Sequence, residues 1–201
     1  MQADLFMFHI VEEFERNIAE FYNAPFAIAT DSCTHAIELC LRLKQFKEIT
    51  VPNRTYISVA FLPIKLQLQS SWNYARWNDY YYIGNTNIID AAVYWRQGGY
   101  ISGSYMCLSF QFQKHLSLGR GGMILCDDEI SYRVLKKMSY DGRDYNIPWR
   151  EQNINTIGYH YYMTPETAKI GMEKLEEAKI TTPRKWEWKD WPDLSRMDVF
   201  K

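Results

Sequence analysis

The sequence predicts an α/β protein in which a mostly parallel sheet is flanked by helices. Two observations carry this prediction. Short apolar runs bounded by turn residues alternate along the chain with longer stretches of helical periodicity, which is typical of parallel strands joined by helices. The 201 residues also contain no internal repeat and no low-complexity linker, so we expect one domain with one sizeable core over residues 1–201.

The first half of the chain is expected to alternate helices with strands. Apolar side chains at helical spacing predict the helices Leu5–Tyr22, Ala36–Phe46 and Thr55–Leu66. Asp31, Ser32 and Thr34 are all competent caps for the second helix, and Pro63 predicts a kink or an early end of the third. Short apolar runs predict the strands Ala24–Thr30 and Glu48–Pro52. Residues 67–87 are polar and aromatic and predict only a short strand at Ser71–Ala75.

The second half is expected to supply three strands and two helices. The strands are Asn87–Ala92, Tyr105–Phe110 and Gly122–Cys126, and the helices are Asp128–Met138 and Thr164–Ile180. We expect the turn Gly119–Gly122 to place its glycines at positive φ, and Pro165 to occupy the first position of the last helix. The tryptophan-rich segment (residues 185–200) is interpreted as a packing or subunit-contact segment without chemistry.

Composition narrows the classes of function. The net charge of −1 and the even mixture of acids and bases give no support for binding nucleic acid or an anionic membrane. No apolar run approaches the about 18 residues of a membrane span, and the N-terminus lacks the basic region of a signal peptide. Four cysteines without a CxxC pair are typical of reduced thiols, so we expect a cytoplasmic protein without a metal site.

Three groups of polar residues could carry chemistry, and each also has an ordinary structural explanation. Ser32 and Thr34 between a strand and a helix could hold a phosphate, or could only cap the helix. Asp90 at a strand end could face a ligand, or could cap a helix or join a structural ion pair. Lys114, five residues after Ser109, could be a desolvated nucleophile or one more solvated lysine.

Their order in the chain is more informative than any one of them. A phosphate cradle, the aromatic Tyr56, the acidic strand end and the Ser–Lys pair are the parts that a pyridoxal phosphate site needs. The cofactor requires an anchored phosphate, a covered ring, a carboxylate beside its pyridine nitrogen and an amine for its aldehyde.

The sequence resembles the DegT/DnrJ/StrS family of sugar aminotransferases, which have the type I fold of pyridoxal phosphate enzymes. The resemblance runs from about Phe14 to Ala178 through five motifs in the family's order. These are the Ser-x-Thr cradle in 14–41, the Pro-x-x-Thr-aromatic segment in 51–60, "IIDAA" at 88–92, "SFQFQKHLSLGRGG" at 109–122 and "GYHYYM" at 158–163.

The resemblance implies a role for each matching residue. Lys114 would hold the cofactor as an internal aldimine and move protons, and Asp90 would pair with the pyridinium nitrogen. Tyr56 would stack on the ring. The phosphate would be held by Ser32, Cys33 through its backbone, Thr34 and Ser109. The reaction implied is the transfer of an amino group from glutamate to a nucleotide-linked keto-sugar.

The chain departs from the family pattern at several points. His160 and Tyr162 stand where the family has Asn and Arg, and Arg120 stands where many members have Glu. The family's Asn helps to hold the phosphate from the partner subunit, so His160 is a candidate for that role. Compared with the family, the chain looks shortened, without most of a C-terminal small domain. Because 16% of the residues are aromatic, we expect a homodimer or larger homo-oligomer.

Two alternatives remain open at this point. The chain could be a non-catalytic ligand-binding protein or partner subunit derived from the family. It could also be related to the family's dehydratases, which often replace the lysine with histidine. His115 follows Lys114 directly, so the position of these two side chains decides between lysine and histidine.

Overall fold

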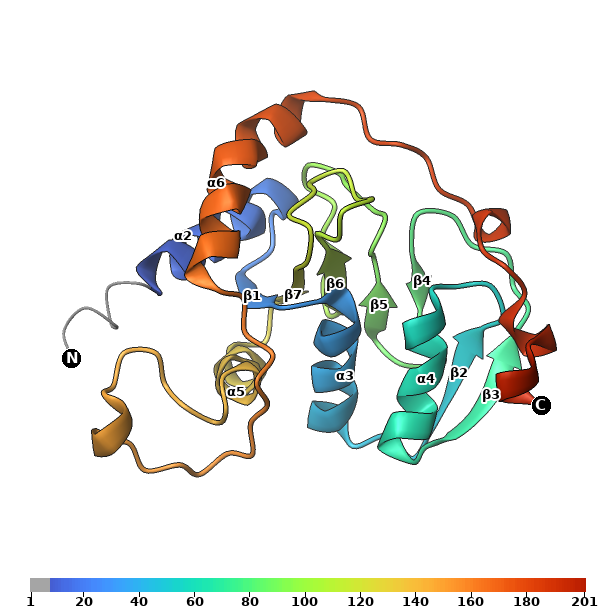
Figure 1. Cartoon of the computed structure of the whole chain (residues 1–201), viewed down its shortest axis with the longest axis horizontal. Helices are drawn as coiled ribbons and strands as arrows, with labels where there is room; N and C mark the ends of the chain where they lie inside the picture. The colour runs from blue at the N-terminus through green and yellow to red at the C-terminus, as the bar shows by residue number, and fades with distance from the viewer. Residues whose placement is uncertain (1–7) are drawn as a thin grey trace.

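The central sheet has five strands in the order β1-β7-β6-β5-β4 (Figure 1) in the computed structural model, which describes residues 8–201. The strands are β1 (Phe26–Thr30), β4 (Tyr81–Tyr82), β5 (Ile88–Asp90), β6 (Tyr105–Ser109) and β7 (Gly122–Cys126). A separate parallel pair is formed by β2 (Glu48–Pro52) and β3 (Gln69–Asn73). The expected α/β class, a sheet flanked by helices, is therefore confirmed.

The strand directions differ from the expected mostly parallel sheet. Within the five-stranded sheet, only β5 and β6 pair in parallel among the described strands, whereas β7 is antiparallel to both of its neighbours and β4 is antiparallel to β5. Parallel neighbours need a long crossover that usually contains a helix, and no helix lies between β4 and β5 or between β6 and β7. Because β7 opposes both β1 and β6, the strands β1, β5 and β6 still share one direction.

Five α-helices cover the two faces of the sheet in the described part of the chain. They are α2 (His9–Tyr22), α3 (Cys33–Lys44), α4 (Ile57–Leu66), α5 (Glu129–Ser139) and α6 (Pro165–Ile180). Each was expected, although Leu5–Met7 of the first predicted helix lie outside the described residues. Pro63 lies inside α4 and does not end it, because only the last turn follows it. Within residues 8–201, no helix has the length and apolar composition needed to cross a bilayer.

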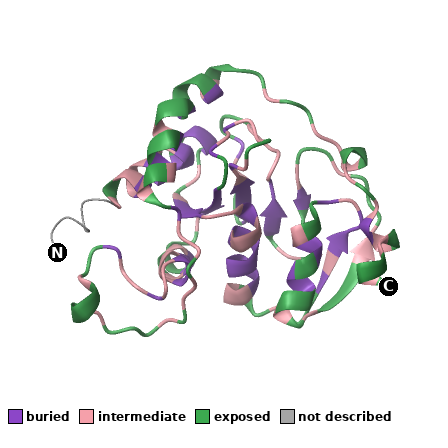
Figure 2. Cartoon of the chain, viewed as in Figure 1, coloured by how far each residue is buried: buried purple, intermediate pink, exposed green. Residues whose placement is uncertain are grey.

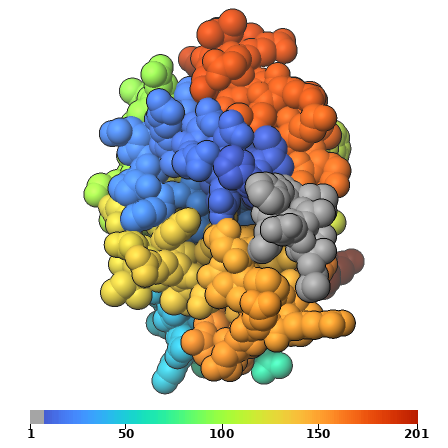
Figure 3. All heavy atoms as spheres, turned by 90° about the vertical axis from the view of Figure 1, so that its left-hand side faces the viewer, coloured from blue at the N-terminus to red at the C-terminus, as the bar shows by residue number. Residues whose placement is uncertain are grey.

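The core lies on both faces of the sheet, because side chains alternate along each strand. On β6, Tyr105 and Cys107 face the cluster formed with α3, α4 and α5, whereas Met106 and Leu108 face α2 and α6. The central strands are buried throughout, and the outer surfaces of the helices are exposed (Figure 2). Seen from the side, α2 lies below α6 and above the loop at 140–158 (Figure 3). Gly171 permits this packing, since a Cβ there would lie 2.7 Å from the Phe14 ring.

From the end of α6 the chain runs over the sheet, and the tryptophan-rich segment brings it to the neighbourhood of α4 and β3 (Figure 1). This segment forms short 3-10 turns, the first at Trp188–Asp190, and its backbone bonds to Trp77 and Asn53. The expected packing role agrees with these contacts.

Candidate functional site

Three strand ends that carry polar residues meet at one edge of the sheet. Thr30 and Ser109 both lie opposite Gly122 in the register of the antiparallel pairs, and Asp90 lies opposite Cys107 on β6. The shared direction of β1, β5 and β6 brings their carboxyl ends to the same side, where ligands gather in α/β sheets. The loop after β1 and the connection after β6 therefore border the end of β5.

The N-terminus of α3 opens at this edge. Ser32 is its N-cap, and the Ser32 hydroxyl oxygen accepts a hydrogen bond from the His35 N–H at 3.2 Å. The Thr34 and Ser58 hydroxyl groups are 2.6 Å apart. Ser32 therefore caps α3 as expected, whereas Thr34 lies in the first turn of the helix and bonds to Ser58 instead of capping it. Ser32, Cys33 and Thr34 also line a cavity, at the end of a helix where anions bind.

Gly122 lets the helix terminus approach the sheet. A Cβ at Gly122 would lie 2.3 Å from the carbonyl carbon of Ser32 and 2.4 Å from the nitrogen of Cys33. In the turn before it, Gly119 has the expected positive φ of 82°. Gly122 lies within β7 and does not adopt a left-handed conformation. A glycine is needed there because any side chain would collide with the backbone of Ser32 and Cys33.

A cavity of about 160 Å³ joins most of the predicted site residues. Its wall contains Ser32, Cys33, Thr34, Tyr56, Asp90, Ser109 and Lys114. A second cavity of about 270 Å³ shares Ser109 and Lys114 with the first and continues toward Arg184 and Trp186. Lys114 therefore lies between two adjoining hollows.

Asp90 is held by donors on both carboxylate oxygens. Oδ2 accepts a hydrogen bond from the Tyr81 hydroxyl at 2.5 Å, and Oδ1 accepts one from the Ala92 N–H at 2.9 Å. The Cys33 thiol lies 3.9 Å from Oδ1. Only 5% of Asp90 is exposed, and burial raises its pKa, while the Tyr81 and Ala92 hydrogen bonds and the charge of Lys114 oppose the increase. The carboxylate accordingly faces the cavity and forms no ion pair within the described residues.

The ammonium group of Lys114 has aromatic neighbours. Its Nζ lies 5.3 Å from the centre of the Trp186 ring and 5.5 Å from that of Trp191. Burial lowers the pKa of Lys114 below its ordinary value of 10.5, and the charge of Arg184 adds to the decrease, although Asp90 and Cys33 oppose it. Lys114 is therefore a desolvated lysine and not an ordinary solvated one.

The His115 side chain lies outside the cavity that Lys114 and Asp90 line. Its Nε2 lies 2.9 Å from the carbonyl oxygen of Ala178, and its ring lines only the second cavity. The amine, and not the imidazole, faces the cavity that contains Asp90.

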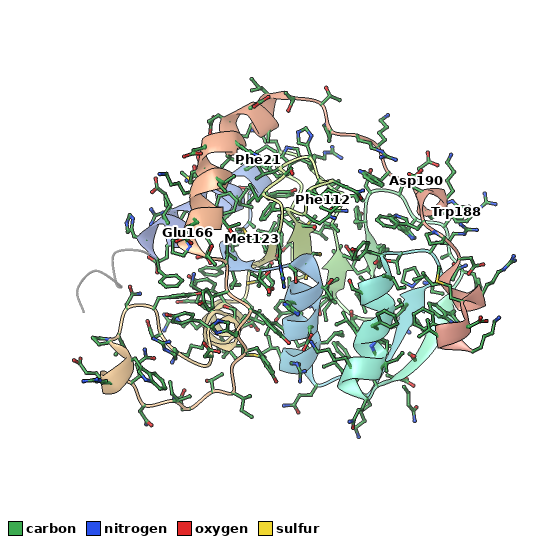
Figure 4. The ribbon with its side chains drawn as sticks, viewed as in Figure 1. Phe21, Phe112, Met123, Glu166, Trp188 and Asp190 are labelled. Carbon is green, nitrogen blue, oxygen red and sulfur yellow. The ribbon has the colours of Figure 1, made fainter. Side chains whose placement is uncertain are left out.

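The aromatic cover of the cavity has two sources. Tyr56 is 49% exposed and meets the Trp191 ring edge-on, with their centres 6.0 Å apart. Trp191 stacks on Trp186 and lines the cavity, and its indole N–H is buried without a hydrogen-bond partner among the described residues. Figure 4 shows Trp188 and Asp190 of the same segment, and Phe112 from the Lys114 connection, above the strand ends. The interpretation of the tryptophan-rich segment as packing alone is thus incomplete, because Trp191 forms part of the wall.

His160 lies apart from the other predicted site residues. It lines a neighbouring cavity with Arg120 and Tyr162, its side chain is 74% exposed, and Nδ1 lies 3.0 Å from an Asp141 carboxylate oxygen. Arg120 lies between this cavity and the central one, and its guanidinium donates to the Asp31 carboxylate at 2.7 Å. Within this chain, His160 and the other site residues are therefore not brought together.

Several residues of the wall were not predicted from the sequence. They are Thr55, Trp77, Tyr81 and Trp191. Tyr81 and Trp77 lie in residues 67–87, which predict only one short strand, and a two-residue strand such as β4 is too short to show a period. The aromatic content of this segment was the only signal of their role.

Comparison with known proteins identifies the family. The model of the DegT/DnrJ/EryC1/StrS aminotransferase family matches residues 4–69 and 91–190. A comparison with curated proteins finds no match.

Three solved structures illustrate the shared fold. AtS13 from Actinomadura melliaura is 19% identical with a TM-score of 0.72, and the match covers 84% of this chain and 60% of that one. A Streptococcus pneumoniae protein in its PLP-form is 16% identical with a TM-score of 0.68, covering 84% and 59%. The dehydratase ColD, a mutant with bound GDP-perosamine, is 16% identical with a TM-score of 0.67, covering 85% and 61%.

This chain spans about 60% of the length of the solved structures that it matches. The family model nevertheless covers most of the 201 residues, on both sides of the segment that contains β4. The chain belongs to the DegT/DnrJ/EryC1/StrS aminotransferase family.

Proposed function

We propose that this chain is a pyridoxal phosphate-dependent aminotransferase that moves an amino group from glutamate to a nucleotide-linked keto-sugar. The observation that supports it most is that Lys114 and Asp90 line the same cavity, beside the N-terminus of α3. A desolvated amine, a buried carboxylate and a helix terminus are the three contacts that this cofactor needs.

The residues present fit the cofactor. An ionised carboxylate has about four acceptor positions. Tyr81, Ala92 and the distant Cys33 thiol occupy those of Asp90 only in part, which leaves an acceptor for a pyridine N–H. Gly122 has no side chain, so the hydroxyl groups of Ser32 and Thr34 and the backbone of Cys33 remain close to the sheet edge, ready for a phosphate.

When bound, pyridoxal phosphate supplies an electron sink that stabilises negative charge on the substrate carbon next to the nitrogen. Lys114 would hold the cofactor at its aldehyde group, and Nζ of Lys114 would be the base that holds and moves the proton at the reacting carbon. Burial favours the neutral amine that this role requires, since it lowers the pKa of Lys114.

Tyr56 and Trp191 would cover the cofactor ring from the cavity mouth. Their aromatic rings meet edge-on, and both line the cavity. The exclusion of water by these rings would strengthen the ionic contact of Asp90.

A second copy of the chain is part of the proposal. Trp149 and Ile157 in the loop at 140–158 are 59% and 80% exposed, which favours burial against another subunit. His160, which follows this loop and whose side chain faces outward, would then help to hold the phosphate in the partner's site.

The first test is amine exchange with glutamate. The purified protein is loaded with pyridoxal phosphate, and 2-oxoglutarate and the visible band of the bound cofactor are measured after glutamate is added. We expect loss of the band with one equivalent of 2-oxoglutarate for each loaded chain, and no exchange in Lys114→Ala. If the cofactor binds but no 2-oxoglutarate forms, the protein is a binding protein or partner subunit and the proposed activity is wrong.

The acceptor is tested in a second step. The amine-loaded protein is mixed with nucleotide-linked 3-keto and 4-keto sugars, and the return of the visible band is followed. Its return with an amino-sugar product supports the substrate class, whereas release of water from the sugar without amination indicates dehydratase chemistry instead.

A further inference from the structure

Tyr81 donates a hydrogen bond to Asp90 and, like Asp90 itself, lies in residues 70–90, which the family model does not match. It lies on β4, directly opposite Asp90 in the antiparallel pair with β5. The family model matches residues 4–69 and resumes at 91, so the segment that carries Tyr81 is not part of the shared pattern. The side chain is nonetheless 8% exposed and packs against the Trp77 ring at 4.9 Å.

The donor and the acceptor in each hydrogen bond of the Tyr81 hydroxyl can be assigned. Its hydroxyl has one proton, which it donates to Asp90 Oδ2 at 2.5 Å. The Thr55 hydroxyl is also in contact with the Tyr81 oxygen and must therefore be the donor of that bond. The result is a buried chain of donors from Thr55 through Tyr81 to the carboxylate.

These two hydrogen bonds, from Thr55 to Tyr81 and from Tyr81 to Asp90, affect both the charge and the orientation of the Asp90 carboxylate. A buried carboxylate without donors takes up a proton, and a proton on Asp90 would remove its attraction for a pyridinium. The Ala92 N–H donates to the other oxygen, the Cys33 thiol lies 3.9 Å from that oxygen and 3.4 Å from the Cys107 carbonyl oxygen, and Lys114 is a nearby cation. Tyr81 is the only donor to Oδ2 among the described residues, so it fixes the plane of the carboxylate as well as favouring its ionised form.

We propose that Tyr81 is a positioning residue that acts through Asp90, keeping this carboxylate ionised and turned toward the ring nitrogen of the cofactor. The proposal rests on the proposed function, since it assigns Tyr81 to the same site. It gives β4, which lies in the segment between the two family-matched stretches, a function in cofactor binding.

The test compares two tyrosines of the same strand. Tyr81→Phe removes the hydroxyl and keeps the ring, whereas Tyr82→Phe is the matched control because Tyr82 is 43% exposed and faces away from Asp90. The first measurement needs no cofactor: the pH at which Asp90 titrates is followed by carboxyl carbon NMR, with Asp90→Asn to assign the signal. The second is the dissociation constant for pyridoxal phosphate.

We expect Tyr81→Phe to raise the titration pH of Asp90 and to weaken pyridoxal phosphate binding about tenfold, the value of one hydrogen bond to a charged group. Tyr82→Phe should change neither. Thr55→Val keeps the Tyr81 ring and removes its donor, so it should shift both quantities in the same direction by less. It also tests the donor chain if Tyr81→Phe proves unstable.

Two results would overturn the proposal. One is an Asp90 titration and a cofactor affinity that stay at wild-type values in both Tyr81→Phe and Thr55→Val. The other is an equal loss of affinity in Tyr82→Phe, which would indicate packing and not positioning. Failure of the proposed function looks different: the wild-type protein would then bind no pyridoxal phosphate, although Asp90 would still titrate at a higher pH in Tyr81→Phe.

Discussion

Replacement of Gly122 by Ala should damage the phosphate cradle without touching any polar group. The new methyl carbon would lie 2.3 Å from the Ser32 carbonyl carbon and 2.4 Å from the Cys33 nitrogen, both backbone atoms. Ordinary contact begins near 3.4 Å, so the two backbones must separate by about 1 Å. Strand β7 is hydrogen-bonded to β1 and β6 on its two sides, and it therefore cannot yield easily. The N-terminus of α3 must move instead.

The displacement sets the magnitude of the effect. Overpacking of this kind costs about 1–3 kcal/mol of folding free energy. A shift of about 1 Å in a binding group costs up to about a hundredfold in a positioned reaction, so we expect affinity for pyridoxal phosphate to fall at least tenfold. Urea denaturation measures the first quantity, and titration of the visible band of the bound cofactor measures the second.

Gly103→Ala is the control for this prediction. Gly103 has a φ of 78° and no atom within 4 Å of a new Cβ, so the substitution adds backbone strain but no contact. It should cost about 1 kcal/mol and leave cofactor affinity unchanged. If Gly122→Ala binds the cofactor as tightly as the control does, the close approach of α3 to β7 does not shape the site and the reasoning is wrong.

Two further predictions concern buried charge. Burial raises the pKa of Glu38, but hydrogen bonds from Lys65 and Arg42 lower it more, to a net value below 4.5. Glu38→Gln should therefore lose about 1–2 kcal/mol of unfolding free energy at pH 7, because its partners Lys65 and Arg42 are partly exposed and can be solvated. The difference from wild type should vanish as the pH falls below the folded-state pKa of Glu38, and a difference that persists in denaturation over a pH series would contradict this prediction. Trp191→Leu should expose Lys114 to water and raise its pKa toward 10.5, because burial is what lowers it. Competitive acylation with peptide mass analysis follows the Lys114 pKa, and an unmoved midpoint would show that the tryptophan-rich segment does not shield the amine.

Much of the fold could be predicted from local patterns. The Ser32 and Thr164 caps mark the starts of α3 and α6, and both form the expected side-chain bonds to the backbone. The strands β2, β6 and β7 have long enough apolar runs to be located within one residue. Strand direction is a property of pairing and connection length, so the antiparallel placement of β7 and β4 could not be deduced from these runs.

The site was predictable only where residues follow strand ends or helix starts. Asp90, Ser109 and Ser32 do so, and they line one cavity with Lys114. Tyr81 reaches the same cavity because β4 pairs with β5, and Trp191 reaches it because the tryptophan-rich segment returns to Tyr56; neither contact leaves a periodic signal in the sequence. His160 faces outward, and its expected role depends on a second subunit.

The central claim is that Lys114 is the amine to which the cofactor is joined. The most direct measurement is to incubate the protein with pyridoxal phosphate, reduce it with borohydride and identify the modified peptide by mass spectrometry. We predict a single pyridoxyl group on Lys114, bound at one equivalent per chain, and none in Lys114→Arg at the same cofactor concentration. Modification spread over surface lysines, with Lys114 unmodified, would contradict the account.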